Sequence, residues 1–178
     1  GLVAMGLVDP ARILMNSNAK PGDVLILGKP LGIGIYSAAL KQEILTPAHY
    51  EEMIASTTRL NTPGTDLSAM DGVHAATDVT GFGLIGHGSE MARGAGVSLV
   101  IEKAKVPVFD GARALAEDGV KTGASGRNWD SVKHLVTGDM TDVERDLLCD
   151  PQTSGGLLVS CAPEVADAVL ALFARHGH

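Results

Sequence analysis

The sequence is poor in cysteine, in aromatic residues and in clustered positive charge. Cys149 and Cys161 are too few and too far apart for a disulfide framework or a four-ligand zinc site, so we expect two reduced core thiols. A net charge of −7 without a basic cluster argues against nucleic-acid binding. No apolar run approaches the roughly eighteen residues of a membrane span, and the N-terminus lacks a signal-peptide pattern. These features predict a cytoplasmic protein.

The residues that are present suffice for a globular core. The chain has 178 residues, of which 45% are hydrophobic, and this length favours one domain with, at most, a fragment of another. Strand-like runs alternate with apolar runs of helical period. This alternation predicts an α+β or α/β fold with a mixed sheet, since hairpins and crossovers cannot be separated from it. Strands are expected at 24–27, 96–102 and 155–161, and helices at 33–45, 47–61, 107–119 and 163–177.

The stretch TDVTGFGLIGHGSEMARG has the glycine order of a dinucleotide-binding fingerprint. Gly81, Gly83 and Gly86 are spaced G-x-G-x-x-G, and Glu102 follows at a distance typical of the acidic residue of that fingerprint. A dinucleotide site needs a strongly apolar strand that runs directly into the first glycine, because the glycines form the turn that holds the pyrophosphate. The preceding residues, GVHAATDVT, are a poor candidate for that strand.

Asp78 and Thr80 point to a second chemistry for the same glycines. A carboxylate beside a pyrophosphate is repelled unless a cation lies between them. Asp78 could therefore be an oxygen ligand of Mg²⁺ in a metal-bridged phosphate site, with the next helix presenting its N-terminus. In a purely structural alternative, Asp78 or Thr80 caps a helix whose glycines allow close packing. The pattern alone leaves all three interpretations open.

A second glycine-rich segment, GKPLGIGI, also follows a strand and opens a helix. Backbone amides freed by Gly32 and Gly34 could face an anion, with Lys29 as a point charge. The order of residues is not that of a Walker A loop. The alternative is a tight turn with a lysine that faces solvent.

Two later segments, 123–130 and 147–160, are rich in loop-forming and polar residues. In the first, Arg127 could clamp a phosphate, or the segment is a surface loop pinned by the ring of Trp129. In the second, Gly155 lets the backbone pass close to another group before a buried strand, although such a loop can also be only a connection.

In this order, GDVLILGKPLGIGI, ATDVTGFGLIGHGSEM, GRN and LLCDPQTSGGLL closely resemble the C-terminal half of the selenophosphate synthetase (selenide, water dikinase) family. The resemblance extends from Gly22 to the end of the chain. DVTGFGL and DPQTSGGLL belong to a superfamily that includes aminoimidazole ribonucleotide (AIR) synthetase, thiamine-monophosphate kinase and the hydrogenase-maturation carbamoyl dehydratase. KPLG together with DPQTSGGLL points to the selenophosphate enzymes within it.

The resemblance implies an α+β fold of the AIR synthetase C-terminal domain type, with a mixed sheet flanked by helices, over 21–178. It assigns 1–20 to the last strand of a missing N-terminal domain and a linker, and it has the chain stop at His178, short of the family's final strands. The whole protein would be a homodimer that uses ATP, Mg²⁺ and selenide to make selenophosphate, AMP and phosphate. The nucleophilic cysteine or selenocysteine lies in the missing domain, so we expect no catalytic residue here and an inactive fragment.

By the same resemblance, Asp78 matches the C-terminal aspartate that joins the metal ligands, where it would neutralise charge between Mg²⁺ and the triphosphate. Gly28 departs from the family, which commonly has threonine there, so a hydroxyl contact at this position is in doubt. Two alternatives remain: another superfamily enzyme with a formylglycinamidine, thiamine or carbamoyl substrate, and a non-catalytic module that binds a partner or an anion. The residues expected to bind ATP are Lys29, Thr80, Gly81, Gly83, Arg127, Asn128, Ser154 and Gly155.

Overall fold

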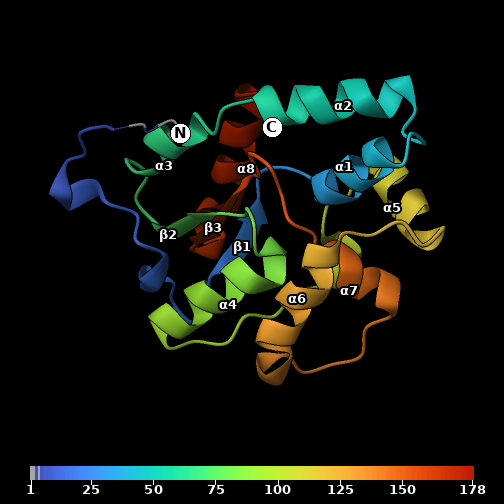
Figure 1. The fold of residues 1–178 in the computed structure, drawn as a ribbon. Helices are drawn as coiled ribbons and strands as arrows, with labels where there is room; N and C mark the ends of the chain where they lie inside the picture. Colours follow the sequence, from blue (N-terminus) through green and yellow to red (C-terminus); the bar gives the residue numbers. More distant parts are fainter. Residues whose placement is uncertain (1–2, 4) are drawn as a thin grey trace.

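A small antiparallel sheet lies at the middle of the molecule, and helices surround it (Figure 1). The computed structural model describes residue 3 and residues 5–178. The sheet order is β1-β3-β2, so the strand that comes last in the chain pairs with both earlier strands. The strands are β1 (Val24–Leu27), β2 (Val73–Asp78) and β3 (Leu157–Cys161).

Several helices begin where threonine or proline supplies a start signal. Thr46, Thr122 and Thr141 each accept a backbone N–H at the start of α2, α6 and α7, and Thr141 forms a capping box with Glu144. The helices are α1 (Ile33–Lys41), α2 (Pro47–Thr58), α3 (Pro63–Leu67), α4 (Gly83–Ala95), α5 (Asp110–Glu117), α6 (Gly123–Val132), α7 (Asp142–Leu148) and α8 (Ala166–Arg175). Short 3₁₀ turns lie at Pro10–Arg12, Asn16–Asn18, Lys103–Lys105, Lys133–Leu135 and Pro163–Val165.

The two faces of the sheet are covered by different helices. On one face, Ala75 and Leu158 belong to an apolar cluster with Leu84 of α4. On the other face, Val159 packs in a cluster with Phe173 of α8. A third cluster joins α1, α2 and α5 beside the sheet, around Ile35, Tyr36, Met53 and Ala112. Because neighbouring strand residues point to opposite faces, β3 contributes to both of the first two clusters.

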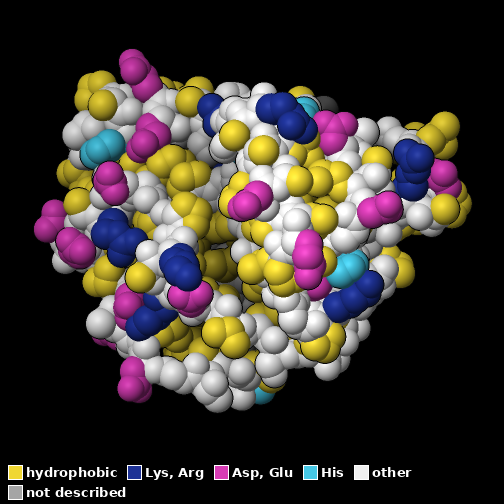
Figure 2. Space-filling model, turned by 180° about the vertical axis from the view of Figure 1, so that it is seen from behind, with side chains coloured by type: hydrophobic (Ala, Val, Ile, Leu, Met, Phe, Trp, Pro, Cys, Tyr) yellow, Lys and Arg dark blue, Asp and Glu magenta, His cyan; other side chains and the backbone are white. Residues whose placement is uncertain are grey.

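The surface behind the view of Figure 1 carries mixed charge. Figure 2 shows acidic and basic side chains interspersed over this face, around a central hollow lined by hydrophobic side chains. In the described part of the chain, no helix combines the length and the apolarity that crossing a bilayer requires.

The α+β class and most of the expected elements are confirmed. Strands form within the expected runs 24–27 and 155–161, and each of the four expected helical segments contains a helix. The sheet is antiparallel rather than mixed, and among the described residues parallel pairing is limited to the isolated bridge between Leu31 and Val108. The alternation of strands and helices does not encode strand direction, which explains this difference.

Two expected segments, a strand and a loop, are not found, and a third lies partly outside the described residues. The strand expected at 96–102 is absent, and Val100 in that segment is 85% exposed, because alternating residues form a strand only when a ladder partner is available. The segment 123–130 is not a loop but most of α6. The N-terminal strand expected within 1–20 includes residues 1, 2 and 4, which lie outside the described residues, and the described part of that range contains no strand.

The end of β2 and the start of β3 pass each other with room only for glycine. Val79 N donates a hydrogen bond to Gly156 O at 2.9 Å. A Cβ atom added to Gly155 would lie 1.7 Å from Val79 O, far inside van der Waals contact. The close passage anticipated for Gly155 from the sequence is therefore a passage against the protein's own backbone.

We predict that Gly155→Ala lowers the free energy of unfolding by at least about 2 kcal/mol, because the added methyl group forces the two backbones apart. Urea denaturation measures this change. The matched control is Gly126→Ala in α6, where no atom lies within 4 Å of the added Cβ. Its higher helix propensity should raise the stability by up to about 1 kcal/mol. Equal effects of the two substitutions would contradict the close passage.

Candidate functional site

The DVTGFGL and DPQTSGG motifs meet where the end of β2 passes the start of β3. Gln152 N donates to Thr80 O at 2.9 Å. Gly83 has φ +70°, and a Cβ atom there would lie 2.6 Å from the carbonyl carbon of Cys149. Thr80, Gly81 and Gly83 therefore lie directly against the residues that precede and form the DPQTSGG segment.

The carboxylate of Asp150 caps the first turn of α1. Its side chain is fully buried, and Oδ2 accepts hydrogen bonds from Gly34 N at 2.8 Å, Ile35 N at 3.4 Å and Gln152 Nε2 at 2.9 Å. Oδ1 is buried without a hydrogen-bond partner. Burial outweighs these bonds and raises the pKa of Asp150 to about 7.

Gln152 completes this cap. Its Oε1 accepts from Gly32 N and Ile33 N, both at 3.2 Å, while its Nε2 donates to Asp150 O at 2.8 Å. Gly32, the N-cap residue of α1, has no side chain with which to cap its own helix. The amides of the GKPLGIGI segment therefore face protein side chains, and they are not free for an anion.

The ammonium of Lys29 is enclosed by carbonyl groups. Lys29 is 4% exposed, and its Nζ donates to the main-chain oxygens of Ser56, Arg59 and Ser154 at 3.1, 2.6 and 2.7 Å. Burial, and then the charge of Arg59, lower the pKa of Lys29. All three N–H donors of Lys29 are in use, so this side chain positions Ser154, which has φ +50°, and offers no free charge to a phosphate.

Asn128 ties α6 to both loops. Its amide nitrogen donates to Gly81 O at 2.9 Å and to Cys149 O at 3.0 Å, and the residue is 9% exposed. The neighbouring Arg127 is exposed. In the GRN motif, the asparagine thus holds the Gly81 loop by hydrogen bonds, whereas the arginine side chain is accessible to solvent.

Asp78 is the exposed carboxylate of this region. It ends β2 opposite Leu157, the first residue of β3. Within the described residues, no group of three or more histidine, cysteine, aspartate or glutamate side chains could hold a metal ion. Asp78 alone would supply one carboxylate, and Mg²⁺ is commonly bound through one or two carboxylates together with substrate phosphates and water.

A cavity of about 560 Å³ adjoins the same loops. Gly81, Gln152 and Thr153 form one side of it, and the charged side chains in its lining are those of Lys41 and Lys121. Lys121 Nζ lies 3.8 Å from Asp146 Oδ2. The charged groups of this lining are therefore both cations, one of which lies beside a carboxylate.

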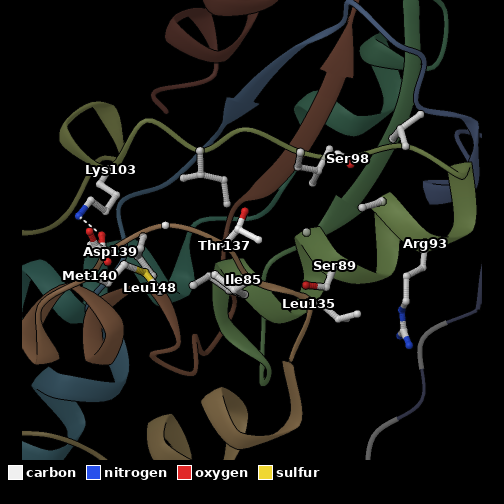
Figure 3. A pocket seen from close by; sticks show the side chains of 17 residues that line it. Ile85, Ser89, Arg93, Ser98, Lys103, Leu135, Thr137, Asp139, Met140 and Leu148 are labelled. Atoms are coloured by element: carbon white, nitrogen blue, oxygen red, sulfur yellow. Dashed lines mark hydrogen bonds between the residues drawn. The ribbon is translucent and has the colours of Figure 1, made fainter. Parts of the chain in front are cut away.

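A second cavity, of about 520 Å³, lies along α4 and contains none of the predicted site residues (Figure 3). Ile85 and Leu148 contribute to its apolar wall. Lys103 at its edge donates to Asp139 O and to Glu144 Oε2, both at 2.8 Å. Lys103 is therefore neutralised within the protein, whereas the other basic side chain of the lining is that of Arg93.

Sequence reasoning missed His87. This residue of α4 is 7% exposed, and its Nε2 accepts a hydrogen bond from Phe82 N at 3.3 Å and lies 3.3 Å from Thr80 Oγ1. Its Nδ1 lies 3.3 Å from Glu90 Oε2. The H-x-x-E spacing on a predicted helix was the available signal, because residues three apart share a helix face.

Neither cysteine has the properties of a nucleophile. Cys149 and Cys161 are both buried and unpaired, as expected. Burial raises the pKa of the Cys149 thiol to about 11 and also raises that of Cys161. Both thiols therefore remain protonated near neutral pH, and the thiolate is the reactive form.

The family described as AIR synthase related protein, C-terminal domain, matches residues 20–178, and the chain belongs to this family. The relatives named selenide, water dikinase confirm the narrower resemblance. The chain is 58% identical to the protein of that name from Pseudomonas straminea and 56% identical to the one from Paraburkholderia xenovorans, in each case over 99% of the chain. It spans about half of their length, 50% and 51% respectively.

Solved structures share the fold at lower identity. Thiamine-monophosphate kinase from Stenotrophomonas maltophilia K279a matches with a TM-score of 0.61 and 22% identity, over 93% of this chain and 47% of that chain. The hydrogenase maturation protein HypE in complex with ATP matches with a TM-score of 0.63 and 23% identity, over 94% and 42%. These likenesses establish the architecture.

We predict that Asp150 makes the stability of the protein fall as pH rises. Because the folded-state pKa is above the ordinary value, the folded protein binds this proton more tightly than the unfolded chain. The stabilisation is complete below the ordinary pKa and is lost as pH rises to about 7. The slope is at most about 1.4 kcal/mol per pH unit.

Urea denaturation between pH 4.5 and 8, chosen to bracket this range, measures the effect. Asp150→Asn should flatten the profile, because it keeps an acceptor oxygen for Gly34 N and removes the charge. Asp78→Asn, at an exposed carboxylate, is the control and should keep the slope of the wild type. A slope that persists in Asp150→Asn would assign the effect to other groups.

Proposed function

We propose that this chain is the ATP-covering half of a selenide, water dikinase. The supporting similarity is the 56–58% identity to proteins of that name. The observation that carries the proposal is the exposed carboxylate of Asp78 at the end of β2, beside a glycine loop held in place by Asn128 and Gln152. A phosphoryl-transfer enzyme needs this combination of a metal ligand and a fixed, unobstructed backbone.

Within this proposal, Asp78 supplies one carboxylate oxygen to Mg²⁺, and the other ligands come from ATP and from the half of the protein that the relatives have in addition. The bound ion would supply neutralisation of the phosphate charges. Asp78 itself lies at a strand end that is anchored by its pairing with Leu157, so its backbone is fixed before any ligand arrives. This rigidity reduces the reorganisation needed at the moment of reaction.

The phosphate-facing surface would be formed by the backbone of the Thr80–Gly83 loop around Gly81. Gly81 leaves open space at its Cβ position, so the loop can approach a ligand closely. Arg127, Lys41 and Lys121 supply positive charge at its border. The remaining predicted residues would support the loop without contacting ATP. Lys29 donates to Ser154 O, and Gly155 O accepts from Asn61.

The whole protein would convert ATP, selenide and water to selenophosphate, AMP and phosphate, in the cytoplasm and as a homodimer. The chain of 178 residues contains no reactive thiol and would not catalyse this reaction alone.

The fold alone is also compatible with the other superfamily enzymes, since thiamine-monophosphate kinase and HypE share it at 22–23% identity. The much higher identity to the dikinases favours selenide as the second substrate. A non-catalytic anion-binding module would leave the exposed Asp78 without a role. The test below separates these possibilities, since only the dikinase forms AMP in a selenide-dependent manner.

We predict that Asp78→Asn in the full-length protein lowers the rate of selenide-dependent AMP formation by at least about tenfold, because loss of one metal ligand weakens charge neutralisation. Higher Mg²⁺ should restore part of the rate. Asp71→Asn, at an exposed carboxylate that precedes β2, should behave as the wild type. An unchanged rate in Asp78→Asn would remove Asp78 from the metal site, and absence of AMP with the wild type would refute the assignment to the dikinases.

A further inference from the structure

A buried histidine supports the loop to which the proposed function assigns the phosphates. His87 is the fifth residue of α4, and its ring turns back toward the residues that precede the helix. The rings of His87 and Phe82 lie 5.4 Å apart with an angle of 38° between their planes. A Cβ atom on Gly86 would lie 2.6 Å from Phe82 Cβ, so glycine at this position is what lets the loop fold down onto the helix.

The hydrogen bonds assign the tautomer of His87. Phe82 N donates to Nε2, and a nitrogen that accepts this bond cannot carry a proton. The proton of the neutral ring is therefore on Nδ1, which faces Glu90 Oε2 at 3.3 Å. A carboxylate in this position fixes both the tautomer and the ring orientation, as carboxylates do for other functional histidines.

The same Nε2 atom lies 3.3 Å from Thr80 Oγ1. The single lone pair of Nε2 is shared between the Phe82 amide and the Thr80 hydroxyl, so both groups are oriented by one atom of His87. Thr80 and Phe82 are the residues on either side of Gly81, whose carbonyl is held separately by Asn128. The loop is thus fixed at three successive residues, and His87 accounts for two of them.

We propose that His87, oriented by Glu90, is a positioning residue: it holds Thr80 and Phe82, and so keeps the backbone of Gly81 between them in the conformation that faces the phosphate groups of ATP. This inference rests on the proposed function. It assigns no chemical step to His87 and does not make Thr80 a nucleophile. Its consequence is specific: loss of the acceptor at the Nε2 position weakens binding of ATP and leaves binding of selenide unchanged.

The test compares two substitutions of the full-length protein that place an amide at different ends of the ring. In His87→Gln, the amide oxygen reaches the position of Nε2 and can accept from Phe82 N. In His87→Asn, the shorter amide reaches only the position of Nδ1. We expect His87→Asn to raise KM for ATP about 3- to 10-fold, equivalent to one lost hydrogen bond, with KM for selenide unchanged, and His87→Gln to recover most of this loss.

His134→Asn, at an exposed histidine outside the site, is the matched control and should leave both KM values unchanged. A purely structural role would lower kcat through loss of folded enzyme and leave KM for ATP unchanged in both His87 variants. That result, or equal KM values in His87→Asn and His87→Gln, would overturn the proposal. If the wild type forms no selenide-dependent AMP, the proposed function fails instead.

A spectroscopic readout tests the placement of His87 without activity. Ring ¹⁵N NMR spectra of the full-length protein should contain a histidine signal with a protonated Nδ1 and an unprotonated Nε2 that disappears in His87→Gln. The signal that His87→Gln removes belongs to His87. If that signal shows a protonated Nε2 in the wild type, the hydrogen bond from Phe82 is refuted and, with it, the positioning role.

Discussion

The structure depends on the buried cap that Asp150 and Gln152 place on α1. Four successive amides, from Gly32 to Ile35, donate to these two side chains. Burying a carboxylate is costly unless hydrogen bonds compensate it, and the positive end of a helix offers several backbone donors at one place. Since Gln152 also bonds through its backbone to Thr80, one short segment fixes the position of α1 and of the glycine loop together.

Other polar side chains around the glycine loop also bind backbone groups of the protein. Lys29 binds three carbonyls, and Asn128 binds the carbonyls of Gly81 and Cys149. Each of these side chains uses its donors on backbone that would otherwise be free to move. The side chains that remain accessible, above all Asp78, then project from a backbone that is already in place. Rigid support of this kind holds the groups that remain accessible in place before a ligand binds.

Sequence reasoning succeeded where the signal is local. The apolar run at Val24–Leu27 and the helical period of α8 depend on neighbouring residues alone. It failed where the partner is distant: the run around Val100 alternates like a strand but has no ladder, and Lys29 finds its carbonyls 27, 30 and 125 residues away. His87 was overlooked although its H-x-x-E spacing with Glu90 was visible, because its contacts with Thr80 and Phe82 form only when the loop folds back onto the helix. The choice of Asp78 combined the argument that a carboxylate beside phosphates needs a bridging cation with the family resemblance.

The DPQTSGG segment has a consequence for how such proteins are recognised. Its aspartate and glutamine cap a helix, its serine carbonyl binds Lys29, and Gly155 passes against Val79. The groups named here, in side chains and backbone, thus make contacts within the fold. A pattern search with this string will retrieve chains that fold in this way whatever molecule they act on, and discrimination among their substrates must come from the accessible positions, such as Arg127 and the lysines beside the Gly81 loop.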